Sequence, residues 1–149
     1  MILDNNRNIA TAIINGGKEY PNIYGTVIFR SMNEGTYVTA NIYGLPEVNG
    51  NMFHGFHLHE YGICDVEKGF SSAGEHYNPS NDIHPMHAGD FPSLLSNNGF
   101  AKLEFYTNRF RPYNIIGKSV MIHENSDDFR TDPAGNSGKR IACGIVRIA

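Results

Sequence analysis

The sequence predicts an all-β protein, with about eight short strands in an antiparallel β-sandwich or barrel that carries two long functional loops. Segments rich in β-branched and aromatic residues recur along the 149-residue chain, and several alternate apolar and polar residues. Clusters of Gly, Asn and Pro separate these segments, as turns do. No amphipathic helical pattern, internal repeat or low-complexity tract interrupts the pattern. Together these observations favour an antiparallel fold.

The first expected strand covers residues 8–15 and ends at Gly16 and Gly17. The next two, 23–32 and 36–45, flank Asn33-Glu34-Gly35, and a turn of this kind between two apolar runs is typical of a hairpin. Further strands are expected at 54–60, 91–96, 100–106, 115–123 and 140–148.

Two long segments lack any helical or strand period, residues 62–90 and 124–139. A structureless loop of this length inside a compact domain is usually functional or disordered. The first segment is rich in histidine, and a bound ion can order a loop that has little apolar surface to bury. We therefore expect both segments to be functional loops grafted onto a rigid frame of strands.

Composition limits the remaining possibilities. The length predicts one domain over residues 1–149, and the net charge of −3 offers no basic surplus for nucleic acid. No run of about 18 apolar residues predicts a membrane-spanning helix. Residues 1–7 are polar and do not resemble a signal peptide, which predicts a cytoplasmic protein, with an extracytoplasmic one as the alternative if a leader was removed.

His57 and His59 lie two residues apart in the apolar and aromatic stretch Phe56–Gly62. Because side chains alternate along a strand, both imidazoles project from one face while Leu58 points to the other. Two neighbouring imidazoles on a stiff strand form half of a metal site. The alternative is a pair of partly buried histidines that are satisfied by hydrogen bonds.

The first long loop contains three histidines and an aspartate within fifteen residues, namely His76, His84, His87 and Asp90. This set of three nitrogen donors and one oxygen donor suits tetrahedral zinc. The alternative is a solvated loop with scattered histidines.

His57, His59 and His123 remain, all at expected strand positions, while we interpret His54 as structural. Imidazole-rich sites suit copper, whose divalent state prefers a roughly square arrangement of nitrogen donors. Three histidines are one short of such a site. His76 could be the fourth if its two ring nitrogens bound two metals at once.

At this point the chain resembles the Cu,Zn superoxide dismutase family. The matching segments are H-G-F-H-L-H-E-Y-G (54–62), S-A-G-E-H-Y-N-P (72–79), H-A-G-D (87–90), I-I-G-K-S-V-M-I-H-E (115–124) and G-N-S-G-K-R-I-A-C-G-I-V (135–146). They occur in family order, whereas the first fifty residues match only in strand pattern. The resemblance implies an eight-stranded Greek-key, immunoglobulin-like architecture.

The resemblance also implies a role for each site residue. It makes His57, His59, His76 and His123 the copper ligands, and His76, His84, His87 and Asp90 the zinc ligands, so that His76 is the bridging imidazolate. It assigns Arg140 to docking of the anionic substrate, and Asp127 to an outer hydrogen-bonded link between His57 and His84.

The two cysteines, Cys64 and Cys143, match the intrachain disulfide of the family, with a spacing before His76 that resembles bacterial-type members. Closing so long a loop would contribute roughly 4–5 kcal/mol. The alternative is a pair of free thiols, as is usual in a reducing compartment.

The implied activity is copper-dependent disproportionation of superoxide to O2 and hydrogen peroxide, in antioxidant defence. The expected partner is superoxide, with no nucleic acid and no membrane, and the chain would be a monomer or a homodimer. The second loop is short for the family, which leaves Arg130, Asp132 and Lys139 to guide the substrate, and Ala134 stands where the family often has threonine.

The alternative function is a copper or zinc carrier, or a metal-stabilised structural domain without turnover. Related chains that lack activity have usually lost ligands or the arginine. This chain retains all of them, which favours the enzyme.

Overall fold

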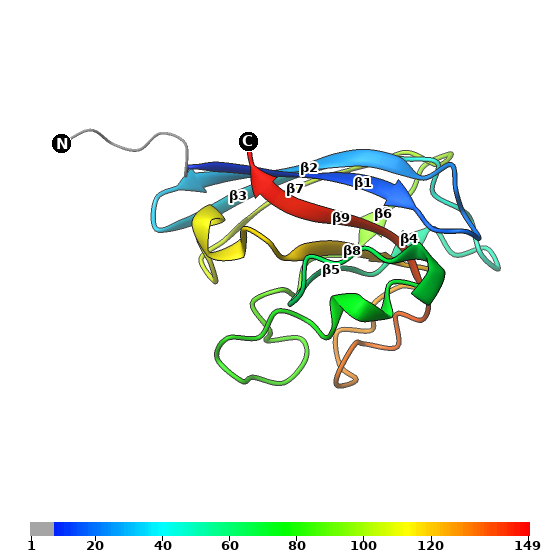
Figure 1. Ribbon diagram of the computed structural model, residues 1–149. Coiled ribbons are helices and arrows are strands. Elements are labelled where there is room, and N and C mark those ends of the chain that lie inside the picture. The colour runs from blue at the N-terminus through cyan, green and yellow to red at the C-terminus, as the bar shows by residue number, and fades with distance from the viewer. Residues whose placement is uncertain (1–7) are drawn as a thin grey trace.

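The structure is a computed structural model, and it describes residues 8–149. Its strands are β1 (Ile9–Gly16), β2 (Tyr24–Met32), β3 (Gly35–Tyr43), β4 (Phe53–His54), β5 (Phe56–His59), β6 (Leu94–Leu95), β7 (Ala101–Thr107), β8 (Ser119–His123) and β9 (Arg140–Ile148). Seven of them form one antiparallel sheet in the order β5-β8-β9-β1-β2-β3-β7, while β4 and β6 pair separately. The large sheet curls, so that β5 and β8 lie beneath β1, β2 and β9 (Figure 1).

This architecture confirms the predicted all-β antiparallel fold. Neighbours in the sheet are not always neighbours in sequence, because β9 lies between β8 and β1, and β7 pairs with β3. Such crossing connections are those of a Greek key. Residues 8–149 contain no α-helix, only the short 3-10 turns η2 (Val66–Lys68), η3 (Ser71–Ala73) and η4 (Pro112–Ile115).

Alternation of side chains builds the core. In β1 the buried residues are Ala10, Ala12 and Ile14, and matching positions of β2 and β3 are buried against them. The rings of Phe56 and Phe91 lie 5.2 Å apart, which joins the lower strands to the long connection that precedes β7. Each fully buried apolar side chain of this size contributes roughly 1.5–3 kcal/mol relative to an exposed one.

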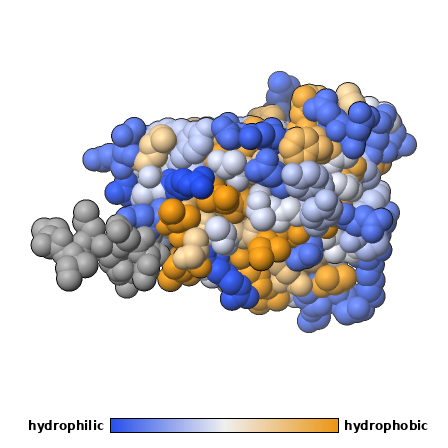
Figure 2. Space-filling model, turned by 90° about the horizontal axis from the view of Figure 1, so that it is seen from above, coloured by the Kyte–Doolittle hydropathy of each residue, from blue (hydrophilic) through white to orange (hydrophobic). Residues whose placement is uncertain are grey.

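The outer face of the sheet is less uniform. Figure 2 shows apolar surface interspersed with polar surface there. Aromatic side chains pack together on this face. The rings of Tyr24 and Tyr43, on paired strands, stack 5.0 Å apart, and the ring of Phe100, just before β7, lies tilted 4.9 Å from that of Tyr43. Cross-strand aromatic pairs of this kind stabilise a sheet by roughly 0.2–1 kcal/mol each.

Most expected strands match within one or two residues at either end, but three are divided or shortened. The segment 54–60 is divided into β4 and β5 at Gly55, whose backbone bonds with Asn125 and His123 instead of continuing the small sheet. The strand expected at 91–96 is reduced to β6. The segment 115–123 enters β8 only at Ser119, because η4 and a turn at Gly117, with a φ of +82°, precede it.

The disulfide predicted between Cys64 and Cys143 is confirmed, and it joins the first long loop to β9 across 79 residues. Cys143 is buried with Phe70, Ala73 and Met121 in a small apolar cluster apart from the main core. Within residues 8–149, no helix has the length and apolar character that crossing a membrane would require.

We predict that replacing both cysteines with serine lowers the free energy of unfolding by about 3–5 kcal/mol, because the 79-residue loop is then unconstrained in the unfolded chain. Denaturant unfolding of the variant and the parent protein, both loaded with the same metals, measures the difference. Far-UV circular dichroism of the variant serves as the control for an unchanged fold. A loss below about 1 kcal/mol would contradict the prediction.

Candidate metal centre

The centre is built on β5, in which each residue is buried. The side chains of Phe56 and Leu58 enter the main core. Those of His57 and His59 therefore project together from the opposite face, as the two-residue spacing predicts. On one side of β5, the backbone pairs with β8, which ends in His123.

The first long loop runs antiparallel along the other edge of β5. The Leu58 amide donates to the Gly89 carbonyl at 2.9 Å, and the Leu58 carbonyl accepts from the Tyr77 amide at 2.7 Å. This pairing places His76 opposite His59 and Asp90 opposite His57. The backbone of a single core strand thus positions ligand candidates from the distant loop.

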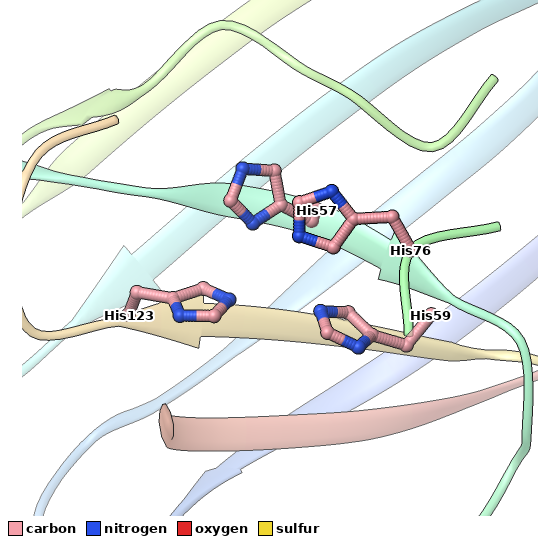
Figure 3. Close-up of side chains that lie close together, drawn as sticks. All are labelled: His57, His59, His76 and His123. Carbon is pink, nitrogen blue, oxygen red and sulfur yellow. The ribbon is translucent and has the colours of Figure 1, made fainter. Parts of the chain in front are cut away.

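Four histidines form the first set, and Figure 3 shows their rings gathered together: His57, His59, His76 and His123. One ring nitrogen of each lies within 4.8 Å of those of the others. The nitrogens left without a hydrogen-bond partner are His57 Nδ1 and the Nε2 atoms of the other three, all of them buried. Buried polar atoms normally have partners, so this group of four bare nitrogens fits a metal cation.

The outward nitrogens of three of these rings have acceptors. His57 Nε2 donates to Asp127 at 2.7 Å, His59 Nδ1 to the Gly74 carbonyl at 2.9 Å, and His123 Nδ1 to the Gly138 carbonyl at 3.2 Å. An acceptor on the outer nitrogen fixes the proton there and leaves the lone pair on the inner nitrogen. The three rings are thus held in the tautomer that ligates a cation.

The second set is His76, His84, His87 and Asp90, whose donor atoms again lie within 4.8 Å of one another. All three rings approach Asp90 through Nδ1, at 2.8 Å from His76, 3.1 Å from His84 and 3.2 Å from His87. Three imidazole nitrogens and a carboxylate fit zinc.

His76 belongs to both sets through different atoms. Its Nε2 is one of the bare nitrogens of the first set, while its Nδ1 faces Asp90 in the second. Its ring stacks on that of His57 with the centroids 4.0 Å apart. A neutral imidazole carries one N–H, so a ring that offers lone pairs from both nitrogens must lose that proton, which two nearby cations would favour.

Asp127 connects the two sets from behind. Its Oδ2 lies 2.7 Å from His57 Nε2, and its Oδ1 lies 2.8 Å from His84 Nε2. The family resemblance implied a link of Asp127 to these same two rings. Gly135, with a φ of +64°, passes so close that a Cβ there would overlap Asp127 Oδ1, so the second loop needs glycine at this point.

Burial controls the protonation of the metal-free rings. Desolvation lowers the pKa of His57 and of His59 well below the usual value, and that of His123 to about 4, with the neighbouring histidines adding to the effect. For Asp90, burial alone would raise the pKa, but the hydrogen bond from His76 and the nearby histidines lower it. A neutral imidazole and an ionised carboxylate are the forms in which these two kinds of group ligate metals.

Arg140 begins β9 directly opposite His123. Its guanidinium donates to the Phe70 carbonyl at 2.8 Å and to the Gly74 carbonyl at 2.6 Å. Burial lowers its pKa, yet an arginine stays charged at any physiological pH. The Gly74 carbonyl also accepts from His59, so it connects the guanidinium to the first set.

The other residues expected to guide the substrate lie differently. Lys139 Nζ lies 3.4 Å from a carboxylate oxygen of Glu19, so its charge is paired at the surface. Arg130 is exposed, and Ala134 is partly buried and accepts hydrogen bonds from Ser137 through its carbonyl. Asp132 points instead towards the second set, where its Oδ1 accepts from the His84 amide at 3.0 Å.

Two contacts near the second set carried no signal in the sequence. One is that of Asp132, and the other is that of Arg109, whose Nη1 donates to the His87 carbonyl at 2.9 Å and lies 3.3 Å from the Pro85 carbonyl. His54 lies outside both sets. It is buried, with ring nitrogens 3.0 Å from the His123 carbonyl and 2.9 Å from the Pro46 carbonyl, which agrees with a structural role.

Similarity to known proteins agrees with this geometry. A family model described as copper/zinc superoxide dismutase (SODC) matches residues 23–146. The chain is 37% identical to superoxide dismutase [Cu-Zn] 4 of Dictyostelium discoideum, over 83% of this chain and 90% of the relative. It is 34% identical to superoxide dismutase [Cu-Zn] of Deinococcus radiodurans, over 84% of this chain and 78% of the relative.

A third relative is longer than this chain. Extracellular superoxide dismutase [Cu-Zn] of Rattus norvegicus is 32% identical over 86% of this chain, and the chain spans only 56% of that relative.

We predict that the free energy of unfolding of the metal-free protein falls as the pH is lowered from about 6.5 towards 4. Unfolded histidines take up protons near pH 6.5, whereas His57, His59 and His123 resist protonation in the folded state, so the unfolded state binds more protons in this window. Each such ring adds roughly 1.4 kcal/mol per pH unit to the slope.

Denaturant unfolding in the presence of a chelator, at a series of pH values, measures this slope. His123→Gln removes one of the three rings and should reduce the slope by about one ring's share. A free energy that stays constant between pH 7 and 5 would show that the buried rings do not resist protonation.

Proposed function

The chain belongs to the copper/zinc superoxide dismutase family, and we propose that it catalyses the disproportionation of superoxide to O2 and hydrogen peroxide. One observation carries this proposal. Four buried ring nitrogens without hydrogen-bond partners lie together, and one of them belongs to a ring whose other nitrogen faces a second donor set. A redox-active cation beside a structural one fits this arrangement.

We assign copper to the first set and zinc to the second. The copper ligands would be His57 through Nδ1 and His59, His76 and His123 through Nε2. The zinc ligands would be His76, His84 and His87 through Nδ1, together with Asp90. When bound, copper supplies the transfer of one electron from a first superoxide and to a second, while zinc, which has no redox chemistry, supplies a fixed positive charge.

The residues of the chain supply orientation and a proton. Two superoxide anions and two protons yield one O2 and one hydrogen peroxide, so the reduced product must be protonated. His76 Nε2 faces the copper set, whereas its Nδ1 is directed to the zinc set. We assign to Nε2 the transfer of one proton to the product, after this nitrogen has taken that proton up from solvent while it ligates no cation. The second proton comes directly from solvent. Asp127 holds two of the other rings in place during this exchange.

Arg140 would dock the anionic substrate. Two of its five N–H donors are directed to the Phe70 and Gly74 carbonyls, which fixes the plane of the guanidinium. The remaining donors can hydrogen-bond a small anion, and the fixed charge raises the rate of encounter. Because Lys139 is paired with Glu19, we assign most of the local positive field to Arg140.

Superoxide is therefore the proposed partner, and we propose neither nucleic acid nor membrane as a further one. The assembly is proposed to be a monomer or a homodimer. For location, both options drawn from the sequence are retained, cytoplasmic and extracytoplasmic. The Cys64–Cys143 disulfide favours the second, because structural disulfides persist in oxidising compartments.

The test is reconstitution. We predict that protein loaded with copper and zinc contains about one of each ion per chain and accelerates superoxide decay, and that selective removal of copper returns the decay to the uncatalysed rate. Metal analysis with pulse-radiolysis or stopped-flow decay measures both quantities. Protein that retains both ions without accelerating the decay would instead be a metal carrier or a metal-stabilised structural protein.

We predict that Arg140→Ala lowers kcat/KM for superoxide by roughly 10-fold or more, since both the fixed charge and the forward-facing donors are lost. Copper and zinc contents should not change, because the guanidinium contacts two carbonyls and no proposed ligand side chain. Arg140→Lys serves as the control, because it keeps the charge and should recover part of the loss. Full activity in Arg140→Ala would remove this residue from the mechanism.

A further inference from the structure

The turn formed by residues 84–87, here called the zinc-ligand turn, carries two of the four proposed zinc ligands, His84 and His87. Its apolar side chains contribute little to holding it in place. Met86 is 56% exposed, and Ile83, just before the turn, is 68% exposed. A segment with so little buried apolar surface opens easily unless polar contacts hold it.

The turn's own hydrogen bonds are local. The Met86 amide donates to the Ile83 carbonyl at 2.7 Å, and the His87 amide donates to Asp90 at 2.9 Å. These two backbone bonds shape the turn but do not reach the sheet or the second loop, to which the turn is joined by the contact of His84 Nε2 with Asp127 Oδ1 at 2.8 Å. Contacts from outside must therefore fix where the turn lies.

A carboxylate from the second loop holds the turn by a backbone amide. Asp132 Oδ1 accepts from the His84 amide at 3.0 Å, across a sequence separation of 48 residues. The same oxygen lies 3.8 Å from His87 Nε2, the ring nitrogen that faces away from the zinc set. Asp132 thus faces the backbone of one proposed ligand and the outer edge of another.

The guanidinium of Arg109, which lies two residues after β7 ends, holds the turn by two of its backbone carbonyls. Arg109 Nη1 donates to the His87 carbonyl at 2.9 Å and lies 3.3 Å from the Pro85 carbonyl. Hydrogen bonds in which one partner is charged are shorter and stronger than neutral ones. The negative residue meets an N–H group and the positive residue meets C=O groups, so each charge matches the backbone dipole that it contacts.

We propose that Arg109 and Asp132 are positioning residues that clamp the zinc-ligand turn from opposite sides and thereby slow the loss of zinc. This inference rests on the proposed function, because it takes His84 and His87 to be zinc ligands. The clamp acts on the second set alone, since neither side chain contacts a residue that belongs only to the first set, within the part of the chain that the structure describes. Its removal should therefore weaken zinc binding and spare copper.

The experiment compares Arg109→Ala and Asp132→Ala, which removes the acceptor oxygens altogether, with two matched controls. Arg111→Ala removes a neighbouring arginine that donates to the Asn33 carbonyl in the β2–β3 turn. Asp82→Ala removes an exposed carboxylate close to the zinc-ligand turn in sequence. All proteins are loaded with copper and zinc, and zinc release to a chelating dye and retained copper are measured at neutral pH.

We predict that Arg109→Ala and Asp132→Ala each speed zinc release by about 10–100-fold, as is typical for loss of an outer-shell partner, while copper retention and both controls match the parent protein. Cobalt substituted at the zinc site should show an altered visible spectrum in these two variants. Arg109→Lys, which keeps the charge and one donor, should recover part of the effect.

Zinc release within about twofold of the parent in both variants would overturn the clamp while leaving the metal assignment intact. Parallel loss of copper and zinc, together with a lower free energy of unfolding, would also overturn it, because the contacts would then serve general stability. A parent protein that takes up no zinc would overturn the proposed function, and the clamp with it.

Discussion

The centre depends on the two backbone hydrogen bonds of Leu58. Its side chain is fully buried in the core, while its amide and carbonyl pair with Gly89 and Tyr77 of the first loop. These bonds hold the first loop against β5, although the loop itself contains only the short turns η2 and η3. His76 is held next to His59 by this pairing. Without it, the donors of the second set would belong to a flexible segment that must pay its ordering entropy when a metal binds.

The donor atoms of both sets are gathered in a buried site, and such an arrangement has a cost in stability when no cation is bound. Buried ring nitrogens without partners are unfavourable, because their hydration is lost without replacement. Bound cations remove this cost, so metal affinity and folding free energy are linked in this protein. Asp127 and the backbone carbonyls that hold the outer nitrogens keep the rings apart in fixed orientations. Of the buried side-chain nitrogen and oxygen atoms without a partner in residues 8–149, all except Ser93 Oγ belong to the histidines of these two sets.

Much of this could be predicted from the sequence. Period-two alternation located most strands and placed His57 and His59 on one face, and the motifs pointed to the disulfide and the donor sets. The division of the expected strand at Gly55 could not be predicted, because it depends on a hydrogen bond to the Asn125 carbonyl of the second loop. Arg109 was not predicted, and Asp132 was expected to guide the substrate instead of contacting the His84 amide, for a similar reason. Each contacts backbone groups far away in the sequence, and a charged residue in a loop carries no local pattern that distinguishes such a role from solvation.

The Gly74 carbonyl is shared by Arg140 and His59. One acceptor atom thus couples the group that would receive the anion to a ring that would hold the redox ion. A displacement of this peptide would misalign both at once, so their geometries cannot drift independently over evolution. Gly74 has a φ of +75°, and a Cβ there would collide with Glu60 and Tyr61, so any other residue would force this peptide to move. Such a movement would impair the proposed docking of the anion and the proposed binding of the redox ion together.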